Sequence, residues 1–210
     1  MLLLRQLHFK MYTLNKDGEL IMVKKIAVAL LCAALGTTLY ARDDISKSQP
    51  FIGVEIGYAT VQGDVGGFFP GEIERDYQGS DIEYGIRLGA QKEDWRTILS
   101  FNYYDSTSDD RAQNYEKYLV AFDYFVLGAT ESIVKPYIGL NAGYINYEST
   151  NNIDMSGFIY GVEAGIVLNV AENVDLDLMY RYSLSNATQD DRDASLDHVG
   201  SIVFSVNYLF

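Results

Sequence analysis

The sequence predicts an all-β fold, an eight-stranded antiparallel up-and-down transmembrane β-barrel with a polar, plugged interior. Three observations predict it. Apolar residues recur at every second position, which is the period of a strand. The other parity repeatedly carries glycines around one polar residue, as in 53–57, 85–89, 139–143 and 161–165. The chain also holds 17 Tyr and 18 Gly but only 3 Pro, which favours strands with aromatic ends over helices.

The polar parity identifies which face of the sheet is inside. An eight-stranded barrel has room only for side chains, so small residues must sit beside long charged ones. In a bilayer the outer face must be apolar and every backbone group paired, which leaves closed barrels as the β solution. A soluble lipocalin-like barrel is the alternative, but it needs an apolar lumen. A pair of membrane helices is excluded because no apolar run reaches the roughly 20 residues that a spanning helix needs.

The N-terminal segment predicts export. Residues 22–41 combine Lys24 and Lys25 with a short apolar core and end in Ala41, which is typical of a signal peptide cleaved near Ala41. The alternative, a retained anchor, conflicts with the shortness of that core. Residues 1–21 lie upstream of this complete signal, so we expect them to be an extension from a misassigned start.

Cysteine and charge narrow the function. Cys32 lies within the signal core, and the large Leu31 before it disfavours a lipoprotein, so the mature chain has no thiol chemistry. Removing residues 1–41 takes away five basic and two acidic residues and changes the net charge from −13 to −16. That charge argues against nucleic acid as a partner. No cofactor or metal is expected.

Eight strands are expected within a barrel domain of residues 42–210, at about 51–62, 81–91, 95–104, 114–127, 135–147, 155–170, 174–185 and 197–210. In the first four the outward apolar residues share one parity: Ile52, Val54, Ile56, Tyr58; Ile82, Tyr84, Ile86, Leu88; Trp95, Leu99, Phe101, Tyr103; Tyr118, Val120, Phe122, Tyr124. Glu116 has the same parity, and we expect it beyond the lipid edge because a lipid-facing carboxylate is destabilising near the midplane.

The last four strands alternate as clearly. Their outward residues are Ile138, Leu140, Ala142, Tyr144; Phe158, Tyr160, Val162, Ala164; Val174, Leu176, Leu178, Tyr180; Ile202, Phe204, Val206, Tyr208, Phe210. The segments 63–80, 105–113, 148–154 and 186–197 are expected as loops, and 92–94, 128–134 and 171–173 as turns. This alternation predicts turns at the periplasmic end and loops at the outer surface.

These features resemble the small eight-stranded outer-membrane barrels of Gram-negative bacteria, the OmpA transmembrane-domain, OmpX and opacity-protein group. The resemblance covers residues 51–210 and implies an outer-membrane location. It also implies that the barrel-assembly machinery reads an alternating apolar strand ending in an aromatic residue, which here is Phe204, Val206, Tyr208 and Phe210. It specifies an architecture rather than a particular member.

Charged residues on the inward parity are the main candidate site. They are Glu55, Glu83, Asp123, Glu163, Asp175 and Asp177, with Arg87, Arg96, Lys117 and Arg181. A charge in a poorly hydrated lumen is costly unless it is paired. We therefore expect a salt-bridge network that plugs the barrel. A small porin-like channel with a gated polar interior is the alternative.

Catalysis and metal binding find little support. His198 has the outward parity, but Gly200 occupies the position of the serine in lipid A deacylases with a His-x-Ser pair, and the nearest serine is Ser201. Asp190, Asp191, Asp193 and Asp197 could supply oxygens to Ca²⁺, but they lack EF-hand spacing and are better explained as a solvated surface.

The predicted function is therefore a non-enzymatic outer-membrane barrel that displays acidic surface loops, for envelope integrity or for surface interaction and adhesion. Phe68 and Phe69 form a candidate loop contact for a host or envelope ligand, and the alternative is that they fold back onto the rim. The other expected partners are outer-membrane lipid, lipopolysaccharide and the barrel-assembly machinery, and we expect a monomer. A lipid-modifying enzyme is the remote alternative.

Overall fold

Antiparallel strands make up almost all of the computed structural model, which describes residues 48–65, 75–106, 112–127, 133–149, 153–189 and 194–210. The predicted signal peptide, Ala41, Phe68, Phe69 and the cluster Asp190, Asp191 and Asp193 lie outside the described residues. Across the described ranges, no helix has the length and apolar character to cross a membrane.

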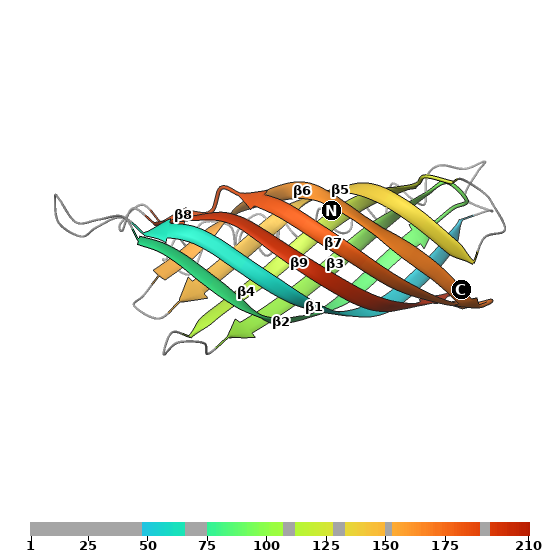
Figure 1. Cartoon of the computed structure of the whole chain (residues 1–210), viewed down its shortest axis with the longest axis horizontal. Coiled ribbons are helices and arrows are strands. Elements are labelled where there is room, and N and C mark those ends of the chain that lie inside the picture. The colour runs from blue at the N-terminus through green and yellow to red at the C-terminus, as the bar shows by residue number, and fades with distance from the viewer. Residues whose placement is uncertain (1–47, 66–74, 107–111, 128–132, 150–152, 190–193) are drawn as a thin grey trace, which may run out of the picture. The chain divides into compact units, whose positions relative to one another are not determined.

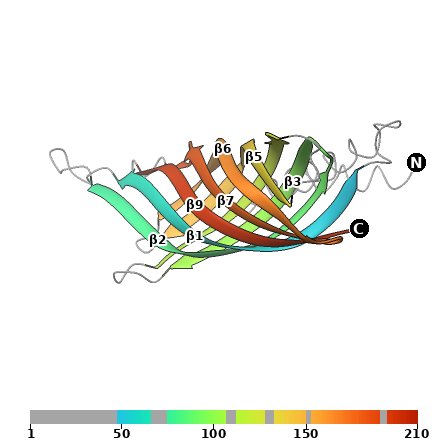
Figure 2. The same ribbon diagram turned by 45° about the vertical axis from the view of Figure 1, so that its right-hand side comes forward.

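The strands are β1 Gln49–Val65, β2 Arg75–Gln91, β3 Trp95–Ser106, β4 Gln113–Phe125, β5 Val134–Ser149, β6 Ile153–Ala171, β7 Val174–Ser185, β8 Thr188–Gln189 and β9 Ala194–Leu209. Each long strand pairs with its neighbours along the chain, and β9 pairs with β1, so the sheet closes on itself. Figures 1 and 2 show these strands inclined around the barrel. Closure removes both sheet edges, and this pairs the backbone groups as a bilayer requires.

Exposure follows the predicted parity, as β9 illustrates. Ile202, Phe204 and Tyr208 are 57%, 42% and 51% exposed, whereas Val203 and Ser205 between them are 0% and 1% exposed. Side chains of a strand point alternately to the two faces, so the first group covers the outside of the barrel and the second group fills the lumen. The prediction of an eight-stranded antiparallel barrel with apolar residues outward is confirmed.

Several predicted boundaries were wrong, and the largest error concerned the segment 63–80. That segment was expected as a loop because it is rich in Gly and charge, but β1 continues to Val65 and β2 begins at Arg75. The pairing Gly63↔Tyr77 belongs to this extension. Ladder hydrogen bonds join backbone groups, so a hairpin can continue beyond its apolar stretch without further apolar side chains.

The expected loop 186–197 also contains strand structure. β8 lies between β6 and β9, and β9 begins at Ala194. At this point Gly157 of β6 approaches the backbone of Ala187 so closely that a Cβ would lie 2.5 Å from the Ala187 Cα. Only glycine permits that approach. At the other end, β4 stops at Phe125, so Val126 and Leu127 belong to the following turn.

Candidate functional site

The ten inward charges are all buried inside the barrel. Each long strand except β5 and β9 contributes at least one of them. These two strands instead contribute the buried asparagines Asn141 and Asn207. Alternation supplies the inward direction, and the cross-strand register decides which of these side chains meet. Seven of them form a connected set of ion pairs, which we call the ion-pair ring: Glu55, Arg87, Arg96, Asp123, Glu163, Asp177 and Arg181.

Arg96 and Asp177 form the first part of the ring. Arg96 lies between two carboxylates, with its Nε 2.6 Å from Asp123 Oδ2 and its Nη2 2.7 Å from Asp177 Oδ2. Arg87 Nη1 is 3.1 Å from the same oxygen of Asp177. The hydroxyl of Tyr137 donates to Asp177 Oδ1 at 2.9 Å, and the Arg96 guanidinium lies 4.2 Å from the centre of the Tyr137 ring. Asp177 therefore accepts a hydrogen bond through Oδ1 and forms ion pairs with two guanidinium groups through Oδ2.

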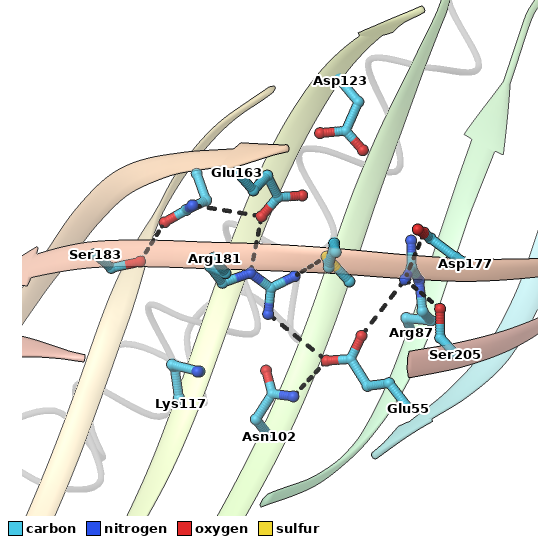
Figure 3. A network of polar contacts seen from close by, with 12 residues as sticks. Glu55, Arg87, Asn102, Lys117, Asp123, Glu163, Asp177, Arg181, Ser183 and Ser205 are labelled. Carbon is cyan, nitrogen blue, oxygen red and sulfur yellow. Dashed lines mark hydrogen bonds and ion pairs between the residues drawn. The ribbon is translucent and has the colours of Figure 1, made fainter. Parts of the chain in front are cut away.

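The second part of the ring runs through Glu55 and Arg181, as Figure 3 shows. Glu55 lies between two guanidinium groups, 3.6 Å from Arg87 Nη1 and 3.7 Å from Arg181 Nη1. Arg181 Nε donates to Glu163 Oε2 at 2.8 Å. Asn102 also donates its amide to Glu55. The pairings thus extend from Asp123 through three arginines to Glu163.

Two further sets of polar contacts lie outside the ring. Lys117 Nζ donates to Glu83 Oε2 at 2.9 Å, and the Tyr115 hydroxyl donates to the same oxygen at 2.6 Å. Asp175 instead accepts from the amides of Gln91, at 3.0 Å, and Asn169, at 2.7 Å. All ten predicted residues therefore lie in the lumen, seven in the ring, two in this separate pair, and Asp175 among amides.

Apolar residues fill the lumen near the loops, which the sequence analysis missed. This loop-end core consists of Ala59, Val61, Tyr104, Tyr115, Leu119, Ile145, Tyr147, Met155, Ile159, Ala187, Ala194, Leu196 and Val199. Its members are at most 3% exposed. Tyr104 and Tyr115 stack with ring centres 4.7 Å apart. The signal was present in stretches such as Ile145 to Tyr147, where the inward parity is also apolar and the alternation fades.

The lipid-facing surface carries the remaining predicted residues. Phe204, Val206, Tyr208 and Phe210 are all exposed on the outside of the barrel. His198 packs against Tyr182, with ring centres 5.2 Å apart, whereas Ser201 lies inside the barrel at 2% exposure. The histidine and the serine are therefore on opposite faces of β9. Glu116 accepts a hydrogen bond from the Tyr118 hydroxyl at 3.0 Å.

Solved structures share this fold. The crystal structure of Neisserial surface protein A aligns with a TM-score of 0.58 at 18% identity, covering 77% of this chain and 97% of that one. The solution structure of outer membrane protein H from P. aeruginosa aligns with a TM-score of 0.52 at 20% identity, covering 77% and 99%. At such identities the likeness concerns the fold alone. A comparison with curated protein sequences finds no match.

A family comparison covers more of the sequence. The profile described as "Outer membrane protein beta-barrel domain" matches residues 28–210. That range includes all nine strands and every member of the ion-pair ring and the loop-end core. On this match, together with the closed sheet and its apolar outer face, the chain belongs to the family of outer-membrane β-barrel proteins.

Proposed function

We propose that this protein is a non-enzymatic scaffold in the outer membrane, which displays acidic loops for envelope integrity or surface interaction. The observation that carries the proposal is the filled lumen. The ion-pair ring closes one part of the barrel and the loop-end core closes another. A protein with this interior is better suited to hold loops in place than to pass solutes.

The sequence of the connections supports a role at the surface. Asp109 and Asp110 lie between β3 and β4, and Asp190, Asp191 and Asp193 lie between β8 and β9. Both connections are at the end of the barrel opposite the tight links Lys92–Asp94 and Glu172–Asn173. In outer-membrane barrels the shorter connections face the periplasm and the longer ones face outward.

Outward tyrosines support a fixed position in the membrane. Five strands, β3 to β7, each place at least one on the outside in the half of the strand nearer the loops: Tyr103, Tyr118, Tyr144, Tyr160 and Tyr182. Tyrosine is favoured at the interface because its ring is apolar and its hydroxyl can reach water. A girdle of this kind would hold the loops just above the lipid headgroups and bring them within reach of lipopolysaccharide.

The absence of catalysis is supported by the two faces of β9. A His-x-Ser pair needs both side chains on one face, but His198 lies outside and Ser201 inside. The exposed strand ending in Phe210 supports recognition by the barrel-assembly machinery, since its alternating apolar residues are accessible from the lipid side.

Conductance of the purified protein in planar bilayers tests the closed lumen. We expect no stable openings, because the ion-pair ring and the loop-end core fill the described part of the lumen with buried side chains. Reproducible openings would overturn the scaffold in favour of the channel. Loop function is tested separately in cells by replacing Asp190, Asp191 and Asp193 with asparagine, and by deleting residues 66–71 with Phe68 and Phe69. Unchanged adhesion and envelope integrity in both variants would contradict the display role.

A further inference from the structure

The ion-pair ring contains one junction that differs from the others. Followed from one ion pair to the next, the residues of the ring are Asp123, Arg96, Asp177, Arg87, Glu55, Arg181 and Glu163. Carboxylates and guanidinium groups therefore alternate along the whole set. The two ends of this series are both acids. Asp123 and Glu163 meet across Gly139, which closes the series into a ring with one acid-acid contact.

Backbone register produces this contact. Asp123 of β4 pairs with Gly139 of β5, and Gly139 pairs in turn with Glu163 of β6. Gly139 has no side chain, and the Asp123 carboxyl occupies its space, because a Cβ there would lie 1.9 Å from Asp123 Oδ1. Figure 3 shows the Asp123 carboxyl beside that of Glu163 at one end of the network. The glycine therefore allows two acids on non-adjacent strands to meet.

The oxygens at this junction have no other donor. Asp123 is paired through Oδ2 and Glu163 through Oε2, while Asp123 Oδ1 and Glu163 Oε1 are buried without a hydrogen-bond donor among the described residues. Two ionised carboxylates in contact repel each other, and a proton between them turns the repulsion into a hydrogen bond.

Charge balance gives the same answer independently. The ring holds four carboxyl groups and three guanidinium groups, so full ionisation would leave one uncompensated negative charge in a buried site. We propose that the Asp123–Glu163 junction is a proton-binding site, and that one shared proton makes the ring electrically neutral in the folded barrel at neutral pH.

The charged groups on the neighbouring strands leave this balance unchanged, since Lys135 of β5 acts on Asp175 rather than on the junction. β3 presents Arg96 to Asp123, β5 presents Tyr137 with its hydroxyl directed to Asp177, and β7 presents Asp177 and Arg181. The more distant charges are accounted for separately, since Lys117 and Glu83 form a neutral pair and Asp175 accepts from amides. No cation remains among these groups to balance the second acid at the junction.

The pH dependence of stability tests the proposal. In the unfolded chain both acids ionise near pH 4. Above that pH the folded barrel therefore binds one proton more than the unfolded chain does, at the Asp123–Glu163 junction. Stability then decreases as pH rises, and the unfolding constant increases about tenfold per pH unit until the folded barrel releases the proton. Asp123→Asn imitates the neutral acid, because its amide donates to Glu163 and its oxygen accepts from Arg96. The test is urea unfolding in detergent micelles between pH 6 and pH 9. We expect the pH dependence of the unfolding constant to be weaker in this variant than in the wild type, by the amount that one bound proton contributes.

Asp175→Asn is the matched control, because this buried acid lies outside the ring among amides, so its substitution leaves the four carboxyl and three guanidinium groups of the ring unchanged. We expect this variant to keep the wild-type slope. Infrared spectra of the wild type provide a second readout that does not depend on folding of a variant. We expect a carbonyl band of a buried, protonated carboxylic acid at neutral pH, absent in Asp123→Asn. Equal slopes for wild type and Asp123→Asn, or no such band in the wild type, would overturn the proposal.

Discussion

The ion-pair ring and the loop-end core fill the same lumen by different physical means. The ring is held by directional contacts, such as the 2.6 Å pair between Arg96 and Asp123, and each charge depends on a particular partner. The loop-end core is held by close packing of Leu119, Ile145 and their neighbours, which depends on shape and volume. The ion-pair ring and the loop-end core should therefore differ in how much stability a substitution removes.

That difference shows how a small barrel can be both closed and specific in register. A strand shifted by two residues keeps its apolar side chains outward, so the lipid-facing surface alone does not fix the register. The ring does, because a shift would separate Arg181 from Glu163, which lie directly opposite each other in the sheet. The loop-end core then adds stability without further charge.

Substitution of Arg96 by methionine should give the largest effect. It removes the partner of both Asp123 and Asp177 and leaves two buried carboxylates without their cation. Removing one partner of a buried ion pair costs about 3–5 kcal/mol. We expect a loss of that order in urea unfolding in micelles, together with loss of the compact band in unheated gels.

Arg96→Lys is the control for this prediction. Lysine keeps the charge but lacks the planar fork that contacts two acids at once, so an intermediate loss is expected. If Arg96→Met were as stable as the wild type, the ring would be a by-product of packing, and the contrast with the loop-end core would disappear.

Truncation in the loop-end core should have the next largest effect. Leu119→Ala removes a buried side chain from close packing, and such changes cost about 2–5 kcal/mol. The matched control is Leu140→Ala, because Leu140 is 66% exposed on the lipid face. Lipid can refill that space, so we expect a loss below about 1 kcal/mol there. Equal losses at both sites would show that the loop-end core is loosely packed.

The fold could be predicted from the sequence because alternation is a local signal. The period of two in residues 158–170 is sufficient to assign a strand and its two faces. The ends of strands were harder to predict, as Val65 and Arg75 show, because ladder pairing continues where side chains are polar. Those residues contribute through backbone hydrogen bonds, which leave little trace in composition.

The site was predictable in its members but not in its connections. Parity alone indicates that Asp123 and Glu163 point inward. Their contact depends on the register of three strands and on the missing side chain at Gly139, and neither is visible along one strand. The loop-end core is hard to predict for another reason, since residues such as Ile159 are apolar on the inward parity, where the alternation predicts a polar lumen.

Tyr115 connects the loop-end core with the Lys117–Glu83 pair, and its substitution should give the smallest effect. Its ring stacks on Tyr104 in the loop-end core, while its hydroxyl donates to Glu83 at 2.6 Å. Tyr115→Phe keeps the stacking and removes only the hydrogen bond to a charged group, which is worth about 1.5–3 kcal/mol. We expect a loss at the lower end, because Lys117 still pairs with Glu83. Tyr118→Phe is the control, because the same kind of bond, to Glu116, is only partly buried on the outer face. It should matter little if Glu116 lies beyond the lipid edge, as we expect. An equal loss in both variants would show that the Lys117–Glu83 pair inside the lumen is as hydrated as a bond on the outer face, and that burial does not strengthen the polar contacts beside the loop-end core.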